Sequence, residues 1–365
     1  YARRFSIRYP NEELQAARPL LTTPIYDKQK AAGAQFGAAY GLEIPLWYAP
    51  INVSDVFSWR RSTDFDHVGA EARAVRESVG LSDISGFAKY RVSGAGAADW
   101  LDHILACRLP AVGRMVLAPM LKDDGKIIGD FSLSRLDDDS FLIIGSGIAE
   151  SYHMRWFLAH LPDTGDVEIN SLGLDLVGLT LAGPKSRDVL QSCVSVDISH
   201  DSMRFMAIKQ IDIGMIPAIV GRVSYTGDLG YEIWVAPAYL NSLFDQLMTA
   251  GAAHHIRLFG SRALNALRLE KNYGSWGREY RPIYGPVETG LDAFVAYDKP
   301  ADFIGKSAAL AERDSGGTMR LCSFVIEAKD ADVIGDEPIA RNGTVVGWIT
   351  SGGYAHGAGK SMAQG

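Results

Sequence analysis

Three runs within residues 114–147, RMVLAPMLKDDGKIIGDFSLSRLDDDSFLIIGSG, decide how this chain folds. The runs RMVLAPML, KIIGDFSLSRL and SFLIIGSG are rich in the apolar and β-branched residues that strands favour. DDG and DDDS separate them, and such clusters are typical of hairpin turns. We therefore predict three strands in this stretch, joined by two tight turns.

Working outward, further strands and helices alternate along the chain without a repeat. FAKYRVSG (87–94) predicts a strand, and so do VEINSLGLDLVGLTLAGP (167–184) and short runs after about residue 300. Apolar residues at helical spacing predict several helices. These helices are HVGAEARAVRESVG (67–80, ending at Gly80), GAADWLDHILA (96–106), SYHMRWFLAHL (151–161), KSRDVLQSCV (185–194), PAYLNSLFDQLMTAGAA (237–253) and SRALNALRLEKN (261–272, capped by Ser261). The mixture predicts the α+β class with a C-terminal β-barrel.

Composition narrows the classes of function. The 365 residues suffice for two or three domains, and 47% hydrophobic with 22% charged residues is typical of a soluble protein. A net charge of −7 without a basic cluster argues against a nucleic-acid partner. The sequence has no run long enough to span a membrane and no metal-ligand spacing among its three cysteines. We expect buried free thiols in a cytoplasmic protein, or in the mitochondrial matrix of a eukaryote.

Three charged residues occur where apolar ones are expected. Asp130 lies within the apolar strand KIIGDFSLSRL, and an acid there must either be paired or serve chemistry. The stretch SYTGDLGYEIWV (224–235) predicts a strand, a turn and a second strand, with Glu232 on the face of Trp234. Glu232 could be solvated or could line a pocket for a flat heterocycle. Arg268 in the apolar helix ALNALRLE could form a structural pair with an acid or contact a ligand.

Taken together, motifs along most of the chain resemble the glycine cleavage T-protein (aminomethyltransferase) family. They occur in the family's order: TTPIYD, VRESVGLSDISGFAKYRVSG, DGKIIGDFSLSRL, LAGPKSRDVL, SYTGDLGYEIW, ALNALRLEKNYGSWG, PVETGLDAFV, DFIGKSAAL and VGWITSGGY. Other stretches are similar to the C-terminal folate-binding half of dimethylglycine and sarcosine dehydrogenases, above all FSWRRSTDFDHVGAEARAVRESVGLSDISGFAKY and ACRLPAVGRMVLAPML.

The resemblance implies a three-domain, cloverleaf-like folate-binding fold. On this basis we expect a linker-like arm over 1–24 and a discontinuous folate-binding domain over 25–85 plus 173–280. We expect an inserted α+β domain over 86–172 and an incomplete C-terminal β-barrel over 281–365. In the dehydrogenases an FAD domain precedes this half, and the present sequence contains no G-x-G-x-x-G fingerprint for one.

The resemblance also implies roles for individual residues. Asp130 matches the family's catalytic aspartate, Glu232 the acid that binds the pterin edge, and Tyr225 a neighbouring folate contact. Two parallel N–H donors of a pterin suit a carboxylate. Arg268 matches an arginine near the folate, where it could hold a carboxylate of the glutamate tail.

Two further residues belong to this comparison with the family, and one of them departs from the family's pattern. Trp276 matches an aromatic near the ring and offers stacking area. Ser146 stands where T-proteins carry an asparagine that orients the pterin. This serine weakens the match to T-protein activity and fits the dehydrogenase branch better.

The function that the resemblance implies is tetrahydrofolate-dependent one-carbon transfer. The expected product is 5,10-methylene-tetrahydrofolate, made from the carbon released when a methylated glycine is oxidised by an FAD-containing domain. Three alternatives stay open: a stand-alone aminomethyltransferase working with a lipoyl carrier protein, a folate-dependent demethylase, and a folate-binding module without catalysis.

Overall fold

The strands predicted within 114–147 form the centre of a five-stranded sheet in the computed structural model, which describes residues 5–365. The order of this sheet is β5-β6-β7-β4-β8, and every neighbouring pair is antiparallel. Both predicted turns join these strands, so the two hairpin predictions are confirmed. The strands are β4 (Ala88–Ser93), β5 (Arg114–Leu121), β6 (Ile127–Asp137), β7 (Ser140–Gly145) and β8 (Glu168–Ser171).

Two helices cover one face of this sheet, α3 (Ala97–Ile104) and α4 (Glu150–Ala159). Their apolar residues, among them Leu101 and Phe157, share one buried cluster with Phe131 and Leu133 of β6. The cluster forms because alternate residues of a strand point to the same side of a sheet. The helices predicted at 96–106 and 151–161 are thereby confirmed, and the opposite face of the sheet stays available to a second layer.

That second layer is a six-stranded sheet with the order β10-β11-β12-β9-β3-β13. Only its pair β3–β13 is parallel. The strands are β3 (Gly80–Asp83), β9 (Val177–Ala182), β10 (Ile208–Ile213), β11 (Ile216–Gly221), β12 (Gly230–Val235) and β13 (Arg257–Leu258). The helices of this lobe are α1 (Tyr26–Ala31), α2 (Asp64–Glu77), α5 (Ser186–Gln191), α6 (Leu240–Gly251) and α7 (Ser261–Leu269), and the hairpin β1 (Ala34–Ala39) and β2 (Leu42–Tyr48) lies beside α7.

Three local predictions differ from the structure. The hairpin expected at 224–235 has its first strand in β11, which ends at Gly221, so residues 222–229 are a loop. Ser224 and Thr226 bond to each other within this loop instead of to a partner strand. Helix α2 ends at Glu77, and Gly80 begins β3. Gly260, not Ser261, is the N-cap of α7, and it has no side chain to cap with.

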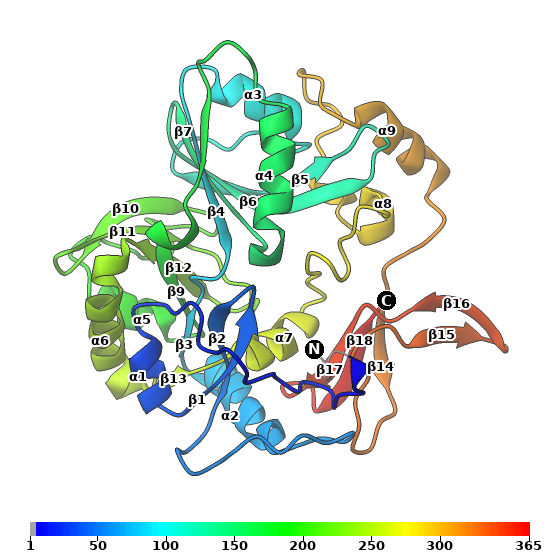
Figure 1. The fold of residues 1–365 in the computed structure, drawn as a ribbon. Coiled ribbons are helices and arrows are strands. Elements are labelled where there is room, and N and C mark those ends of the chain that lie inside the picture. The colour runs from blue at the N-terminus through cyan, green and yellow to red at the C-terminus, as the bar shows by residue number, and fades with distance from the viewer. Residues whose placement is uncertain (1–4) are drawn as a thin grey trace.

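The C-terminal lobe contains a three-stranded sheet, β14-β18-β17, and a separate hairpin, β15–β16 (Figure 1). Its strands are β14 (Ser323–Ile326), β15 (Pro338–Arg341), β16 (Thr344–Trp348), β17 (Ser351–Ala355) and β18 (Lys360–Gln364). The segment between residues 281 and 315, which we expected within this lobe, instead forms α8 (Pro286–Thr289) and α9 (Lys306–Ser315). Buried Phe303 and Ile304 attach it to the lobe of the five-stranded sheet, so the strands of the C-terminal lobe begin only at Ser323.

The three lobes meet around one central region (Figure 1). The arm before α1 is held by an ion pair in which the Arg18 guanidinium contacts the Glu43 carboxylate at 2.6 Å. Cys107 and Cys193 are buried as expected, but Cys322 is exposed, which corrects the expectation of three buried thiols. Among the described residues, no helix is long and apolar enough to cross a membrane.

Candidate active site

The two sheets pack against each other, and Asp130 and Glu232 each lie on the strand face that is turned toward the opposite sheet. Trp234 of β12 packs with Leu142 and Ile144 of β7. In the β6–β7 ladder, Ser132 and Ser134 pair with these two residues of β7 and so share their face. Asp130 lies two residues before Ser132, and Glu232 two residues before Trp234. Because side chains alternate along a strand, both acids point between the sheets.

Asp130 is a partly exposed carboxyl with one buried oxygen that finds no donor. Its Oδ1 has no hydrogen-bond partner among the described residues. Burial raises the pKa of Asp130 to about 8, a hydrogen bond from its own backbone N–H opposes the rise, and the charge of Glu279 adds to it. The group therefore carries a proton at neutral pH. A buried oxygen without a partner is the kind of exception that a ligand explains.

Glu232 is likewise partly exposed, and no other charge contributes to its titration. Burial alone raises the pKa of Glu232 to about 7. Its backbone is fixed in the ladder between Gly221 of β11 and Thr180 of β9, so the side chain has a defined direction. A carboxylate in this position can accept two parallel N–H donors from a flat ligand.

Tyr225 and Tyr280 lie within electrostatic reach of Asp130. Burial raises the pKa of both phenols, and the charge of Asp130 adds to both shifts. The Tyr225 hydroxyl donates to the Gly274 carbonyl, and its ring stacks on Tyr273 with a centroid distance of 6.0 Å. The loop 273–280 and the loop before β12 therefore form an aromatic wall beside Asp130.

Trp276 belongs to the same loop but lies deeper. It is 8% exposed and packs in a cluster with Ile127 and Ala149. The ring of His153 stands edge-on to it at a centroid distance of 4.9 Å. Burial lowers the pKa of His153 to about 4, so this imidazole is neutral. The indole of Trp276 thus supports the wall from behind, and most of its surface is used by protein contacts.

Ser146 directly follows β7 and is partly exposed. Ser132 pairs with Ile144 in the β6–β7 ladder, so continuing the same register by two residues brings Ser146 opposite Asp130. The Ser146 carbonyl accepts the Ala149 N–H at 3.0 Å, which closes a turn at the end of β7. The register of the two strands thus places Ser146 across from the position of Asp130, just beyond the end of β7.

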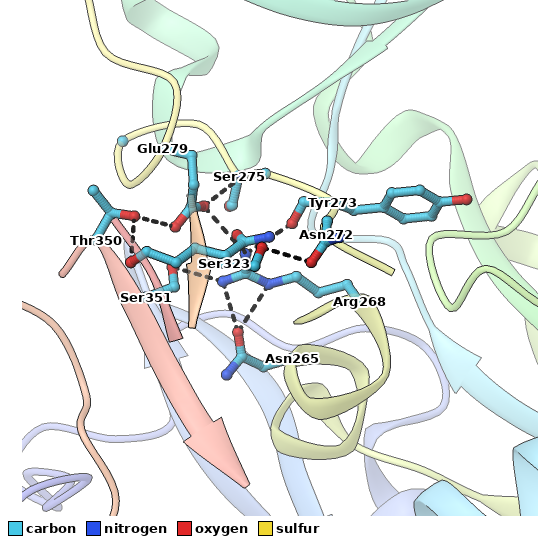
Figure 2. Close-up of polar contacts among 12 residues, drawn as sticks. Asn265, Arg268, Asn272, Tyr273, Ser275, Glu279, Ser323, Thr350 and Ser351 are labelled. Carbon is cyan, nitrogen blue, oxygen red and sulfur yellow. Dashed lines mark hydrogen bonds and ion pairs between the residues drawn. The ribbon is translucent and has the colours of Figure 1, made fainter. Parts of the chain in front are cut away.

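Arg268 is 4% exposed and donates from every guanidinium nitrogen to protein acceptors (Figure 2). Nη1 contacts the Glu279 carboxylate at 3.1 Å, and this is the structural pair that the sequence left open. The remaining acceptors are the Asn265 side chain, the Tyr273 carbonyl, the Gln364 side chain and the Ser351 hydroxyl. These contacts tie α7 to the C-terminal strands and occupy the donors that a ligand would need.

Two cavities flank the Arg268–Glu279 pair. One of about 400 Å³ lies between α2, α7 and β17, and Arg268 is among its lining residues. The other, of about 250 Å³, is lined by Glu279, Thr350 and the apolar side chains of the C-terminal lobe. Within residues 5–365, neither of these cavities is lined by Asp130 or Glu232. The features that mark a site between the sheets are the orientation of Asp130 and Glu232 and the raised pKa of each. No group of three or more metal-ligating side chains was found among the described residues.

Glu279 and Tyr280 are members of this region that the sequence analysis did not identify. They occur in the segment GREYR, where alternating charges and the absence of an apolar period favour an exposed loop. Glu279 is instead 1% exposed. Its burial follows from contacts with Arg268 and Thr350, which lie outside its own loop. A local sequence pattern cannot predict contacts of this kind.

Two family models together match most of the chain. The GCVT N-terminal domain matches residues 25–299, and the glycine cleavage T-protein C-terminal barrel domain matches residues 320–365. The human protein named mitochondrial dimethylglycine dehydrogenase is 35% identical over 360 residues, which cover 98% of this chain and 42% of that protein. The chain thus spans less than half the length of that relative.

A shorter relative and a solved structure match over most of their lengths. A protein of Halothermothrix orenii named aminomethyltransferase is 30% identical over 332 residues, which cover 90% of this chain and 87% of that protein. The crystal structure of glycine cleavage system aminomethyltransferase T from Bartonella henselae superposes with a TM-score of 0.82 at 24% identity. It covers 94% of this chain and 89% of that one, and at this identity it supports the shared fold.

Proposed function

The chain belongs to the glycine cleavage T-protein family, and from this premise we propose that it transfers a one-carbon unit to tetrahydrofolate. The proposed product is 5,10-methylene-tetrahydrofolate. The observation that carries the proposal is the pair of acids between the two sheets, Asp130 and Glu232. Burial raises the pKa of both carboxyls, and in the described part of the chain no positive charge offsets either shift.

Glu232 suits the pterin edge. Its carboxylate would accept the two adjacent N–H donors of the amino-pyrimidinone, and such parallel bonds to a charged acceptor are strong. Hydrogen bonds to the charged form lower the pKa of a carboxyl. Since burial raises the pKa of Glu232 to about 7, binding would release a proton from part of the population at neutral pH.

Asp130 suits the reacting end of the ligand. When bound, tetrahydrofolate would supply the N5 and N10 amines that accept the one-carbon unit. Asp130 holds a proton at neutral pH because burial raises its pKa to about 8. It can therefore donate a proton to a leaving amine or hydroxyl, and its carboxylate can then stabilise a nearby cation.

The other residues that the sequence singled out receive supporting roles. Tyr225 would offer its ring to the ligand, since its hydroxyl is already bonded to the Gly274 carbonyl. Ser146 would bond to the ligand beside Asp130. Trp276 would support the wall through packing. We assign Arg268 to structure, because its donors are engaged by protein acceptors.

The proposed carbon donor is the iminium or formaldehyde unit formed when a methylated glycine is oxidised. Support comes from the 35% identity to a protein named dimethylglycine dehydrogenase. The oxidation would occur on an FAD-containing dehydrogenase domain, which we propose as the partner of this chain.

An aminomethyl group on a lipoyl carrier protein is the second candidate donor. The protein named aminomethyltransferase matches this chain over 87% of its own length, which favours this possibility. The two donors differ in their by-product, because transfer of the methylene carbon from an aminomethyl group must release ammonia. Ammonia release with a loaded carrier, and none with formaldehyde, would separate them.

The experiment that tests the proposal compares binding with turnover. The affinity for tetrahydrofolate and the rate of methylene-tetrahydrofolate formation from formaldehyde, above the uncatalysed rate, are measured for the wild type and Asp130→Asn. The enzyme hypothesis is supported if the wild type accelerates the reaction and Asp130→Asn does not, while both proteins bind tetrahydrofolate with the same affinity. Binding by both proteins without acceleration would indicate a folate-binding module instead.

A further inference from the structure

Glu279 stands at the junction of the three lobes and is held by donors from three separate segments (Figure 2). Its Oε2 accepts from Arg268 Nη1 of α7 at 3.1 Å and from the Ser275 backbone N–H of its own loop at 2.8 Å. Its Oε1 accepts from the Thr350 hydroxyl, next to β17, at 2.6 Å. With 1% of its surface exposed, this carboxylate is fixed in one geometry.

The loop that Glu279 closes carries the aromatic wall beside Asp130. The Tyr280 N–H bonds to the Ser275 carbonyl at 3.2 Å, and the Gly277 N–H bonds to the Tyr280 carbonyl at 2.8 Å. Gly274 accepts the Tyr225 hydroxyl and is packed so closely that a Cβ there would come within 2.4 Å of the Tyr280 ring. A movement of Glu279 would therefore be passed on to both tyrosines.

Glu279 also acts on Asp130 through charge. In the described part of the chain, the negative charge of Glu279 acts with burial to raise the pKa of Asp130. The phenols of Tyr225 and Tyr280 also lie within electrostatic reach of Asp130, Glu232 lies on the opposing sheet, and neutral His153 packs against Phe131 on the other face of β6. Among the described residues, Arg268 pairs with Glu279 at 3.1 Å and forms no hydrogen bond or ion pair with Asp130.

We propose that Glu279 is a positioning residue for the one-carbon transfer, acting on Asp130 through its charge and on Tyr225 and Tyr280 through the loop 273–280. The inference rests on the proposed function, since it assigns Asp130 to that reaction. Arg268 takes part by holding Glu279. Glu279 does not contact the ligand itself, so it is distinct from the catalytic and binding residues.

Two substitutions separate the two effects. Glu279→Gln removes the charge and keeps the shape, whereas Thr350→Val removes one anchor and keeps the charge. The titration of Asp130 is followed by carbon NMR of the labelled carboxyl, and the pH profile of turnover is measured in parallel. In Glu279→Gln we expect both midpoints to move to lower pH, because removing the negative charge favours the ionised form of Asp130. In Thr350→Val we expect turnover to fall several-fold with the midpoints unmoved, and Thr350→Ser to restore it.

Each outcome decides the inference. A Glu279→Gln protein with lower thermal stability but unchanged midpoints would show a merely structural role and overturn the proposal. If Glu279→Gln does not fold, loss of turnover in Thr350→Val with rescue in Thr350→Ser supports the positioning role, and unchanged turnover in Thr350→Val overturns it. If the wild type shows no folate-dependent turnover, the proposed function has failed, and the NMR titration of Asp130 alone decides whether Glu279 acts on it.

Discussion

Replacing Asp130 by asparagine should change how the stability of the protein depends on pH. In the folded chain burial raises the pKa of Asp130 from 3.8 to about 8, so the folded state binds a proton that the unfolded state has lost above pH 4. The extra proton held by the folded state stabilises it. This stabilisation is fully present below pH 3.8 and is lost as the pH rises towards 8. Asparagine has no charge to lose, so the variant escapes this loss.

The magnitude follows from the shift. Each pKa unit corresponds to about 1.4 kcal/mol, so the stability of Asp130→Asn relative to the wild type should rise by up to about 3 kcal/mol between pH 5 and pH 7. Asp130 is partly exposed, and solvent screening reduces this ceiling, so we expect about 1–3 kcal/mol. Any cost of the new amide group is the same at every pH and does not affect the trend.

Differential scanning calorimetry at pH 5, 6 and 7 measures this trend. The matched control is Asp138→Asn, which alters an exposed aspartate in the turn between β6 and β7. Its stability relative to the wild type should not change with pH. Parallel pH curves for Asp130→Asn and the wild type would refute the reasoning, because they would mean that Asp130 titrates normally in the folded protein.

Three further predictions concern packing and burial. Gly129→Ala should lower the free energy of unfolding by about 1–3 kcal/mol in thermal unfolding, because a Cβ would lie 2.5 Å from the Phe131 ring; unchanged stability would contradict this packing. In native protein at pH 8, iodoacetamide should label exposed Cys322, while Cys107, whose burial raises its pKa to about 12, should label only on unfolding, as mass spectrometry can test. Burial lowers the pKa of Lys89 to about 8, so the stability of Lys89→Met relative to the wild type should fall by about 1–3 kcal/mol from pH 8 to pH 10; a constant difference in chemical denaturation would count against this.

The strands around the site were predictable because local pattern determines them. Alternating apolar residues and the DDG and DDDS turns were enough to identify β5, β6 and β7. The same pattern singled out Asp130, since an acid in an apolar strand contradicts its surroundings. Glu232 stood out for the same reason in β12.

The loops and long-range pairs were not predictable in the same way. The segment 222–229 contains strand-forming residues, yet internal hydrogen bonds between Ser224 and Thr226 hold it as a loop. Arg268 could not be assigned because its partner Gln364 lies 96 residues away. Glu279 was not singled out from the sequence, because its partners come from α7 and the C-terminal lobe.

The most direct test of the central claim is calorimetric titration of the purified chain with tetrahydrofolate. The wild type and Glu232→Gln are compared, with Glu168→Gln on exposed β8 as the matched control. We predict that the wild type and the control bind tetrahydrofolate in the micromolar range and that Glu232→Gln does not bind it. Equal binding by all three proteins, or no binding by the wild type, would contradict a folate site between the two sheets.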